Sequence, residues 1–89
     1  NTHDNNRYTV KALTPISEFN EFFNAEIHDN EYDTVGGFVI NTFGYLPKRG
    51  EIIDFERFNI KILRADKRRV HLILFTQIDS GNSLENNSK

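Results

Sequence analysis

One stretch, residues 33–50, constrains the fold of this chain more than any other part of the sequence. Thr34 (or Asp33) is a residue type that caps a helix N-terminus. Gly44 suits a left-handed C-terminal cap, and Pro47 cannot continue a helix. The side chains between these signals form a stripe at helical spacing: Val35, Phe38, Val39, Thr42 and Phe43. The segment predicts a short amphipathic helix that ends in a turn.

Two further elements are predicted before this helix. Residues 8–13 alternate with period two and indicate a strand. Thr14 can then cap a helix, and Pro15 suits its first position because no N–H is needed there. That helix is expected to end near residues 24–25, with an apolar stripe of Ile16, Phe19, Phe22 and Phe23.

Three strands are predicted after it. Glu51–Phe55 is followed by a tight connection at residues 56–57, and Phe58–Ile62 alternates between apolar and polar residues. Residues 66–68 form a hairpin turn. Arg69–Gln77 is the last strand, with apolar residues on both faces: Val70, Leu72 and Leu74 on one, Ile73 and Phe75 on the other.

The element order β-α-α-β-β-β predicts an α+β fold, a two-layer sandwich with a largely antiparallel sheet. Both helices are expected on one face of the sheet, because nothing else can bury Phe19, Phe23, Phe38 and Phe43. We expect one folded domain over residues 8–78. The polar ends, residues 1–7 and 79–89, are predicted to be disordered.

Composition excludes several classes of function. The 89 residues contain no cysteine, which excludes disulfides, thiolate metal sites and thiol catalysis. No apolar run approaches the roughly 20 residues that span a bilayer, so we expect no direct membrane insertion of this segment. The chain lacks methionine even at position 1, which predicts a piece of a longer protein. Residues 1–33 hold seven acids and two bases, whereas residues 34–89 hold six acids and nine bases. This asymmetry indicates either a polar contact surface or an ordinary solvated one.

Several motifs together resemble the CorC/HlyC transporter-associated domain. They are Thr14-Pro-Ile16 before a short helix, Tyr32-Asp-Thr-Val-Gly-Gly37 after an acidic loop, and Gly44-Tyr-Leu-Pro-Lys-Arg-Gly-Glu51. The closing strands fit the same pattern, so the resemblance covers roughly residues 8–78.

This resemblance implies a fold similar to PCMH-type FAD-binding domains. It also implies a C-terminal domain on the cytoplasmic side of an inner-membrane protein linked to magnesium and cobalt efflux, or of a putative haemolysin. Its expected partners are a pair of CBS domains and the membrane region of the same full-length protein. Such domains are thought to modulate ion transport rather than perform it, so neither an enzyme nor a resident cofactor is predicted.

The glycine pair is the first candidate site. Gly36 and Gly37 could expose backbone N–H groups at a helix start and bind an anion, such as the phosphate of a nucleotide or flavin. One glycine pair lacks the spacing of a dinucleotide fingerprint. The simpler interpretation is that small residues let the helix pack closely on its neighbours.

Charged side chains give three further candidates. His28, Asp29, Glu31 and Asp33 could bind a divalent cation through oxygen ligands, although such a loop is usually only solvated. His71 is expected to be structural. Lys48-Arg49 and Lys67-Arg68-Arg69 could bind an acidic partner, lipid headgroups or nucleotide phosphates. Nucleic acid is not expected, because the sequence pI is near 5.9 and no recognition motif is present.

No catalytic arrangement follows from the spacing of Ser17, Thr42 and Tyr45. The leading hypothesis is a non-enzymatic regulatory domain that acts through contacts with CBS domains or with a second copy of itself. Those contacts are expected to use Phe and Ile residues on the less covered face of the last strands. The alternative is a sensing module for a nucleotide, flavin or divalent cation.

Overall fold

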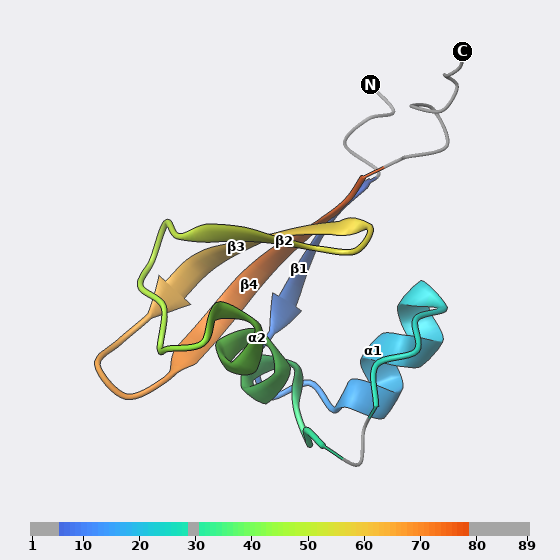
Figure 1. The fold of residues 1–89 in the computed structure, drawn as a ribbon, viewed down its shortest axis with the longest axis horizontal. Coiled ribbons are helices and arrows are strands. Elements are labelled where there is room, and N and C mark those ends of the chain that lie inside the picture. The colour runs from blue at the N-terminus through green and yellow to red at the C-terminus, as the bar shows by residue number, and fades with distance from the viewer. Residues whose placement is uncertain (1–5, 29–30, 79–89) are drawn as a thin grey trace.

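The computed structural model describes residues 6–28 and 31–78. A four-stranded antiparallel sheet and two helices make up this part of the chain (Figure 1). The elements in chain order are β1 (Arg7–Lys11), α1 (Ile16–Phe23), α2 (Val35–Phe43), β2 (Ile52–Phe55), β3 (Phe58–Ala65) and β4 (Val70–Gln77). The α+β class, the element order and the antiparallel sheet are confirmed. The likeness to PCMH-type domains stays a prediction. Apart from residues 6 and 7, the two predicted tails lie outside the described residues.

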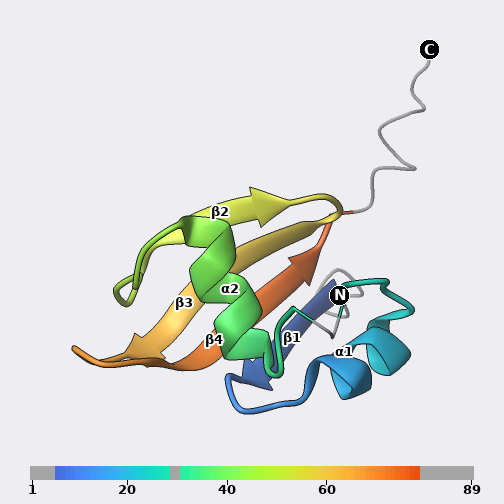
Figure 2. The same cartoon turned by 60° about the horizontal axis from the view of Figure 1, so that its bottom comes forward.

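The strands lie side by side in the order β1-β4-β3-β2. The last three strands form the predicted meander, since β2 pairs with β3 and β3 pairs with β4. β1 joins the sheet beside β4, with Val10 opposite Ile73, so both β1 and β2 are edge strands. Both helices lie on the same side of this sheet (Figure 1). α2 crosses the sheet and α1 lies beside β1 (Figure 2), with the ring of Phe19 against that of Phe75.

The start of α1 differs from the prediction. Thr14 was expected as its cap, but Pro15 is the N-cap residue, and no side chain caps the helix. The reason is a contact with the chain before α2. The backbone oxygen of Thr14 accepts from the Val35 N–H at 2.9 Å, and the oxygen of Asp33 accepts from the Ile16 N–H at 3.1 Å. The backbone of a distant segment thus replaces the side-chain cap.

α2 begins and ends as predicted. The Thr34 hydroxyl oxygen accepts from the Gly37 N–H at 3.2 Å, which makes Thr34 the cap. Gly44 ends the helix in the left-handed region, with φ of 84°. The connection between β2 and β3 is also tight, and Glu56 adopts a φ of 51° there.

The core lies between the helices and the inner face of the sheet. Its centre is aromatic: the ring of Phe19 lies 4.8 Å from that of Phe75 and 4.5 Å from that of Phe23, between centroids. Thirteen hydrophobic residues are buried in it: Ala12, Ile16, Phe19, Phe23, Val35, Phe38, Val39, Phe58, Ile60, Ile62, Val70, Ile73 and Phe75.

Val70 lies on a different face from the one predicted. Strict alternation along β4 places it with Leu72 and Leu74, yet its side chain is buried in the core. The cause is an irregular register between β3 and β4. Ile62 pairs with Ile73, but Ala65 pairs with Val70, so Leu63 and His71 have no direct partner in the ladder. His71 is thus an extra residue in β4, and the side chains on its two sides, Val70 and Leu72, lie on opposite faces of the sheet.

Candidate functional site

The glycine pair at the start of α2 is packed against the end of β1. The Gly36 N–H donates to the backbone oxygen of Ala12 at 2.9 Å, and the Gly37 N–H donates to the Thr34 hydroxyl at 3.2 Å. These donors therefore already have acceptors inside the protein. An anion or phosphate at this helix start would have to displace them, so the anion site at Gly36 and Gly37 stays a prediction that carries this cost.

Gly36 has no room for a side chain. A Cβ atom built on it would lie 2.8 Å from the Ala12 Cβ and 3.1 Å from the Ala12 oxygen. The same atom on Gly37 would lie 3.6 Å from the Thr34 hydroxyl oxygen, which is ordinary contact. The two neighbouring glycines differ in this respect: Gly36 permits the close approach of α2 to β1, whereas Gly37 is exposed.

The motif at residues 44–51 closes the connection from α2 to β2. The Tyr45 hydroxyl donates to one carboxylate oxygen of Glu51, and the Lys48 N–H donates to the other at 2.9 Å. The hydrogen bond from Tyr45 and then that from Lys48 lower the pKa of Glu51, and the bond to Glu51 raises the pKa of Tyr45. Gly50, with φ of 95°, donates its N–H to Ile62 on β3. These contacts order the connection between α2 and β2 and tie it to β3.

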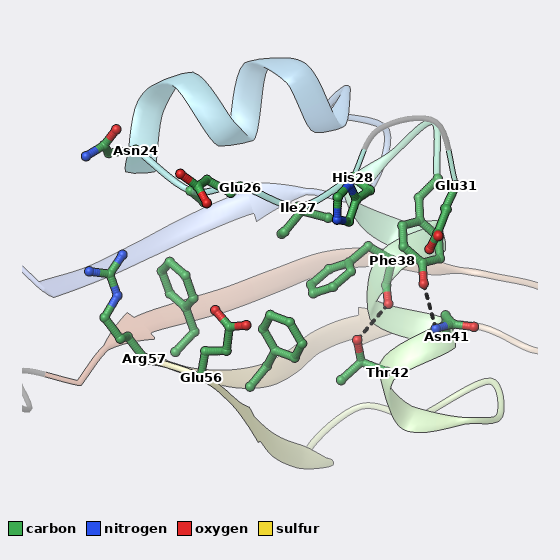
Figure 3. Close-up of a pocket in the computed structure, with 14 residues that line it drawn as sticks. Asn24, Glu26, Ile27, His28, Glu31, Phe38, Asn41, Thr42, Glu56 and Arg57 are labelled. Atoms are coloured by element: carbon green, nitrogen blue, oxygen red, sulfur yellow. Dashed lines mark hydrogen bonds between the residues drawn. The ribbon is translucent and has the colours of Figure 1, made fainter.

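A cleft of about 710 Å³ lies between the segment after α1, α2 and the turn from β2 to β3 (Figure 3). Its inner wall carries aromatic side chains, with Phe38 and Phe55 in contact at 4.9 Å between ring centroids. The charged side chains Glu26, Glu31, Glu56 and Arg57 also line the cleft, together with His28. The arrangement suits a ligand with a flat or apolar body and a cationic group.

Only some of the predicted cation ligands line this cleft. His28 and Glu31 line it, Asp33 does not, and Asp29 lies outside the described residues. Within residues 6–28 and 31–78, no three His, Asp or Glu side chains come close enough to hold a metal ion. Sequence reasoning missed Phe55, Glu56 and Arg57 as part of the same site, because they come from a turn far along the chain. Only the alternation of β2 hinted that Phe55 faces the helices.

The three residues considered for catalysis lie on different elements. Ser17 is on α1, Tyr45 follows α2, and Thr42 is on α2, where its hydroxyl donates to the backbone oxygen of Phe38 at 2.9 Å. In Figure 3 this bond lies beside the one from Asn41 to the Tyr32 hydroxyl, at 2.8 Å. The Thr42 bond lies within α2, whereas the Asn41 bond ties α2 to Tyr32 in the segment before it.

The basic clusters lie together at one end of the sheet. The turn that carries Lys48 and Arg49 and the hairpin that carries Lys67–Arg69 are neighbours in both views (Figures 1 and 2), and all five side chains are exposed. Asp66 orders the hairpin. Its carboxylate accepts from the Arg68 and Arg69 N–H groups at 2.7 and 2.9 Å, and it contacts the His71 ring nitrogen at 2.7 Å. His71 therefore has a structural partner.

Asp66 makes the stability of the hairpin dependent on pH. The hydrogen bond to His71, followed by those from Arg68 and Arg69, holds the pKa of this carboxyl well below its ordinary value of 3.8. A carboxyl with a lowered folded-state pKa stabilises the fold above its unfolded pKa, and that contribution is lost as the pH falls below about 4. We expect Asp66→Asn to lower stability at neutral pH and to flatten the loss of stability on acidification. Urea unfolding at neutral pH and near pH 3 measures both effects.

His71→Gln is the matched control, because it leaves the Asp66 carboxylate and its two backbone bonds in place. Its acid dependence should fall between those of the original protein and Asp66→Asn. Equal acid dependence in all three proteins would contradict this account of the hairpin.

The outer face of the sheet, which the helices leave open, carries different side chains from those predicted. Phe58, Phe75 and the isoleucines of β3 and β4 are buried in the core, so the prediction of a contact surface made of these residues is wrong. The outer face instead carries basic and aliphatic side chains: Arg7, Lys11, Lys61, Arg64, Leu72 and Leu74, with exposed Ile52 at its edge. Alternation predicts which residues of each strand share a face, but only the pairing of β1 with β4 shows that the basic residues of different strands lie together.

Comparison with known proteins identifies the family. The family model for the CorC/HlyC transporter associated domain matches residues 1–79. The chain belongs to this domain family. A crystal structure from Neisseria meningitidis shows the region associated with a putative Mg²⁺ and Co²⁺ transporter, CorC. It is 38% identical with a TM-score of 0.78, and the match covers 82% of this chain and 90% of that one. The domain from a Xylella fastidiosa hemolysin, in complex with Mg²⁺ and Mn²⁺, is 30% identical with a TM-score of 0.71, covering 82% and 89%.

The chain matches only part of each curated relative. The magnesium and cobalt efflux protein CorC of Vibrio cholerae is 47% identical over 72 residues, which are 81% of this chain and 25% of the relative. The Escherichia coli protein of the same name is 48% identical over 63 residues, or 71% and 22%. The chain thus spans about a quarter of the length of these relatives. In the described part of the chain, no helix is long and apolar enough to cross a membrane.

Proposed function

We infer that this CorC/HlyC domain is a non-enzymatic accessory part of a divalent-cation transport protein, and that it modulates magnesium or cobalt transport through protein contacts. One observation carries the proposal: the chain matches about a quarter of the length of each of two proteins that are named for magnesium and cobalt efflux. The roles of its motif residues support it. Tyr45, Glu51 and Gly36 hold the fold together, which is expected of a domain that presents surfaces rather than reacting groups.

The expected position of the domain follows from the same resemblance. It lies on the cytoplasmic side of the inner membrane, as part of an integral membrane protein, and contacts the CBS domains and membrane region of that protein. A second copy of the domain is a further possible partner. The open basic face of the sheet, with Lys61 and Arg64 beside Leu72 and Leu74, is the surface best suited to such contacts.

Transport measurement tests this function. The full-length protein that contains this chain is placed in vesicles, and Mg²⁺ movement is followed with an indicator dye, with and without residues 8–78. We expect the shortened protein still to transport Mg²⁺, but at a different rate from the full-length protein. A matched control replaces the outer-face pair Lys61 and Arg64 with glutamate, which leaves the core intact. Identical rates in all three proteins would contradict a modulating role.

A second candidate is direct sensing of a small ligand. It is favoured by the Xylella fastidiosa domain, which is described with Mg²⁺ and Mn²⁺. Glu26, Glu31 and Glu56 line the cleft of this chain, but they do not come together as a set of three metal ligands. Titration calorimetry with Mg²⁺, Co²⁺, adenine nucleotides and FAD tests it. Saturable heat that is lost in Glu31→Gln would support the cleft, and heat lost only in Gly36→Ala would support the helix start. Absence of heat with every one of them would rule out sensing of these ligands by the domain.

A further inference from the structure

β1 presents an unpaired edge. It is the terminal strand of the sheet, and no described residue pairs with its outer side (Figure 2). The Ala12 N–H donates to the His71 oxygen at 3.0 Å, and the register continues through Val10 opposite Ile73. Backbone groups alternate in direction along an antiparallel strand. Those of Arg7, Thr9 and Lys11 therefore point away from β4. Within residues 6–28 and 31–78, only the Lys11 oxygen among them has a backbone partner, the Thr14 N–H at 3.0 Å.

A largely apolar groove runs along the same edge. It has a volume of about 840 Å³ and lies between β1 and α1. Phe22 of α1 is 68% exposed beside it, and its ring meets that of Tyr8 at 5.5 Å between centroids. Leu13, just beyond the strand, is 75% exposed. A strand added to β1 would place alternate side chains over this groove and cover Phe22.

Charge narrows the kind of segment that fits. The side chains of Arg7 and Lys11 leave the same edge on the opposite, outer face of the sheet. There Lys11 and Arg64 both lie opposite Leu72, and Lys61 lies opposite Leu74. A second copy paired around Thr9 would set Arg7 against Lys11 of the other copy, and like charges in opposing positions destabilise a strand pair. Carboxylates at those positions would instead find basic partners.

We propose that the free edge of β1 binds an extended segment of a partner protein in which carboxylate and apolar residues alternate. The segment pairs with the outward N–H and C=O of Thr9 and with the outward N–H of Lys11, because the Lys11 oxygen already accepts from the Thr14 N–H. Its carboxylates face Arg7 and Lys11, and its apolar residues lie in the groove against Tyr8 and Phe22. This inference rests on the proposed function, because it names the surface and the chemistry through which the domain makes its protein contacts.

A designed peptide tests the edge directly. The probe is a heptapeptide in which glutamate and valine alternate, labelled for fluorescence anisotropy. One control is a heptapeptide in which lysine and valine alternate. The other has the composition of the probe, but its glutamates and valines are grouped in two separate blocks. We expect saturable binding of the alternating glutamate peptide alone. Amide hydrogen exchange of Thr9 and Lys11 should slow on binding, because their N–H groups acquire acceptors. No saturable binding of the glutamate–valine peptide would overturn the proposal.

Variants separate the edge from simple charge attraction. Thr9→Pro removes an outward N–H that β4 does not use, and proline is tolerated on the solvent side of an edge strand. We expect it to keep the native circular dichroism spectrum and to weaken binding about tenfold. The double substitution Arg7→Glu with Lys11→Glu should reverse the preference toward the lysine–valine peptide. Val10→Pro is the contrasting control, since it removes a bond to β4 and should damage the sheet itself.

Three results would assign the edge to something else. Binding that survives Thr9→Pro unchanged would show that charge alone attracts the peptide. If the Thr9 amide exchanges more slowly as the protein concentration rises, in the absence of peptide, the edge would be assigned to a second copy of the domain. Phosphatidylglycerol vesicles that bind in place of the peptide would assign the basic face to a membrane. The transport assay is independent of all three, so failure of the edge proposal leaves the modulating function standing.

Discussion

Replacing Phe19 with alanine should remove a large share of the stability of this domain. The side chain is 2% exposed, and its ring lies 4.5, 4.8 and 5.8 Å from those of Phe23, Phe75 and Phe58, between centroids. Phe→Ala changes in a core cost about 3–5 kcal/mol, because transfer energy is lost and a cavity remains. Small domains are stabilised by roughly 5–15 kcal/mol in total. We expect the urea midpoint and the melting temperature to fall sharply.

The size of the change follows from the position of Phe19 between α1 and the sheet. Each kcal/mol shifts the melting temperature of a domain of this length by about 4–8 °C. Phe22→Ala is the matched control: it lies on the same helix, is 68% exposed and should cost less than about 1 kcal/mol. Similar losses for the two variants, measured by urea unfolding followed by circular dichroism, would mean that α1 is not anchored through Phe19.

Local patterns predicted most of the fold because they act over a few residues. Thr34 caps the start of α2 and Gly44 caps its end, through contacts within one turn. Alternation along β3 likewise separates buried Ile60 from half-exposed Lys61. The errors came from contacts between distant segments. Thr14 lost its capping role to a backbone contact with Val35, and the face of Val70 depends on an irregular register that no period reveals.

The candidate sites were harder to predict for the same reason. The cleft joins Glu31 of one connection with Phe55 and Arg57 of another, and nothing in either pattern refers to the other. The edge of β1 depends on which strand β1 pairs with. Residues 8–13 predict a strand from their alternation, but they do not say whether it lies in the middle of the sheet or at its edge. Arg7 and Lys11 become a feature of one surface only once β4 lies beside them.

Adding a single methyl group to Gly36 should destabilise the domain, although alanine favours helices. The new Cβ would lie 2.8 Å from the Ala12 Cβ and 3.1 Å from the Ala12 oxygen, so the backbones of α2 and β1 must separate. Overpacking of this kind costs about 1–3 kcal/mol, and the gain from helix propensity is about 1 kcal/mol. The hydrogen bond from the Gly36 N–H to Ala12 also lengthens from 2.9 Å. We expect a net loss of about 1–2 kcal/mol in urea unfolding.

Gly37→Ala makes the same chemical change one residue later with the opposite expected sign. Its Cβ meets only the Thr34 hydroxyl oxygen, at 3.6 Å, so the helix propensity gain of about 0.5–1 kcal/mol should appear as added stability. Ala12→Gly in the Gly36→Ala background should restore part of the loss, because it removes the nearer of the two crowded atoms. Equal effects of the two glycine substitutions would show that the helix start is not packed as described. It would then be open to bind an anion instead.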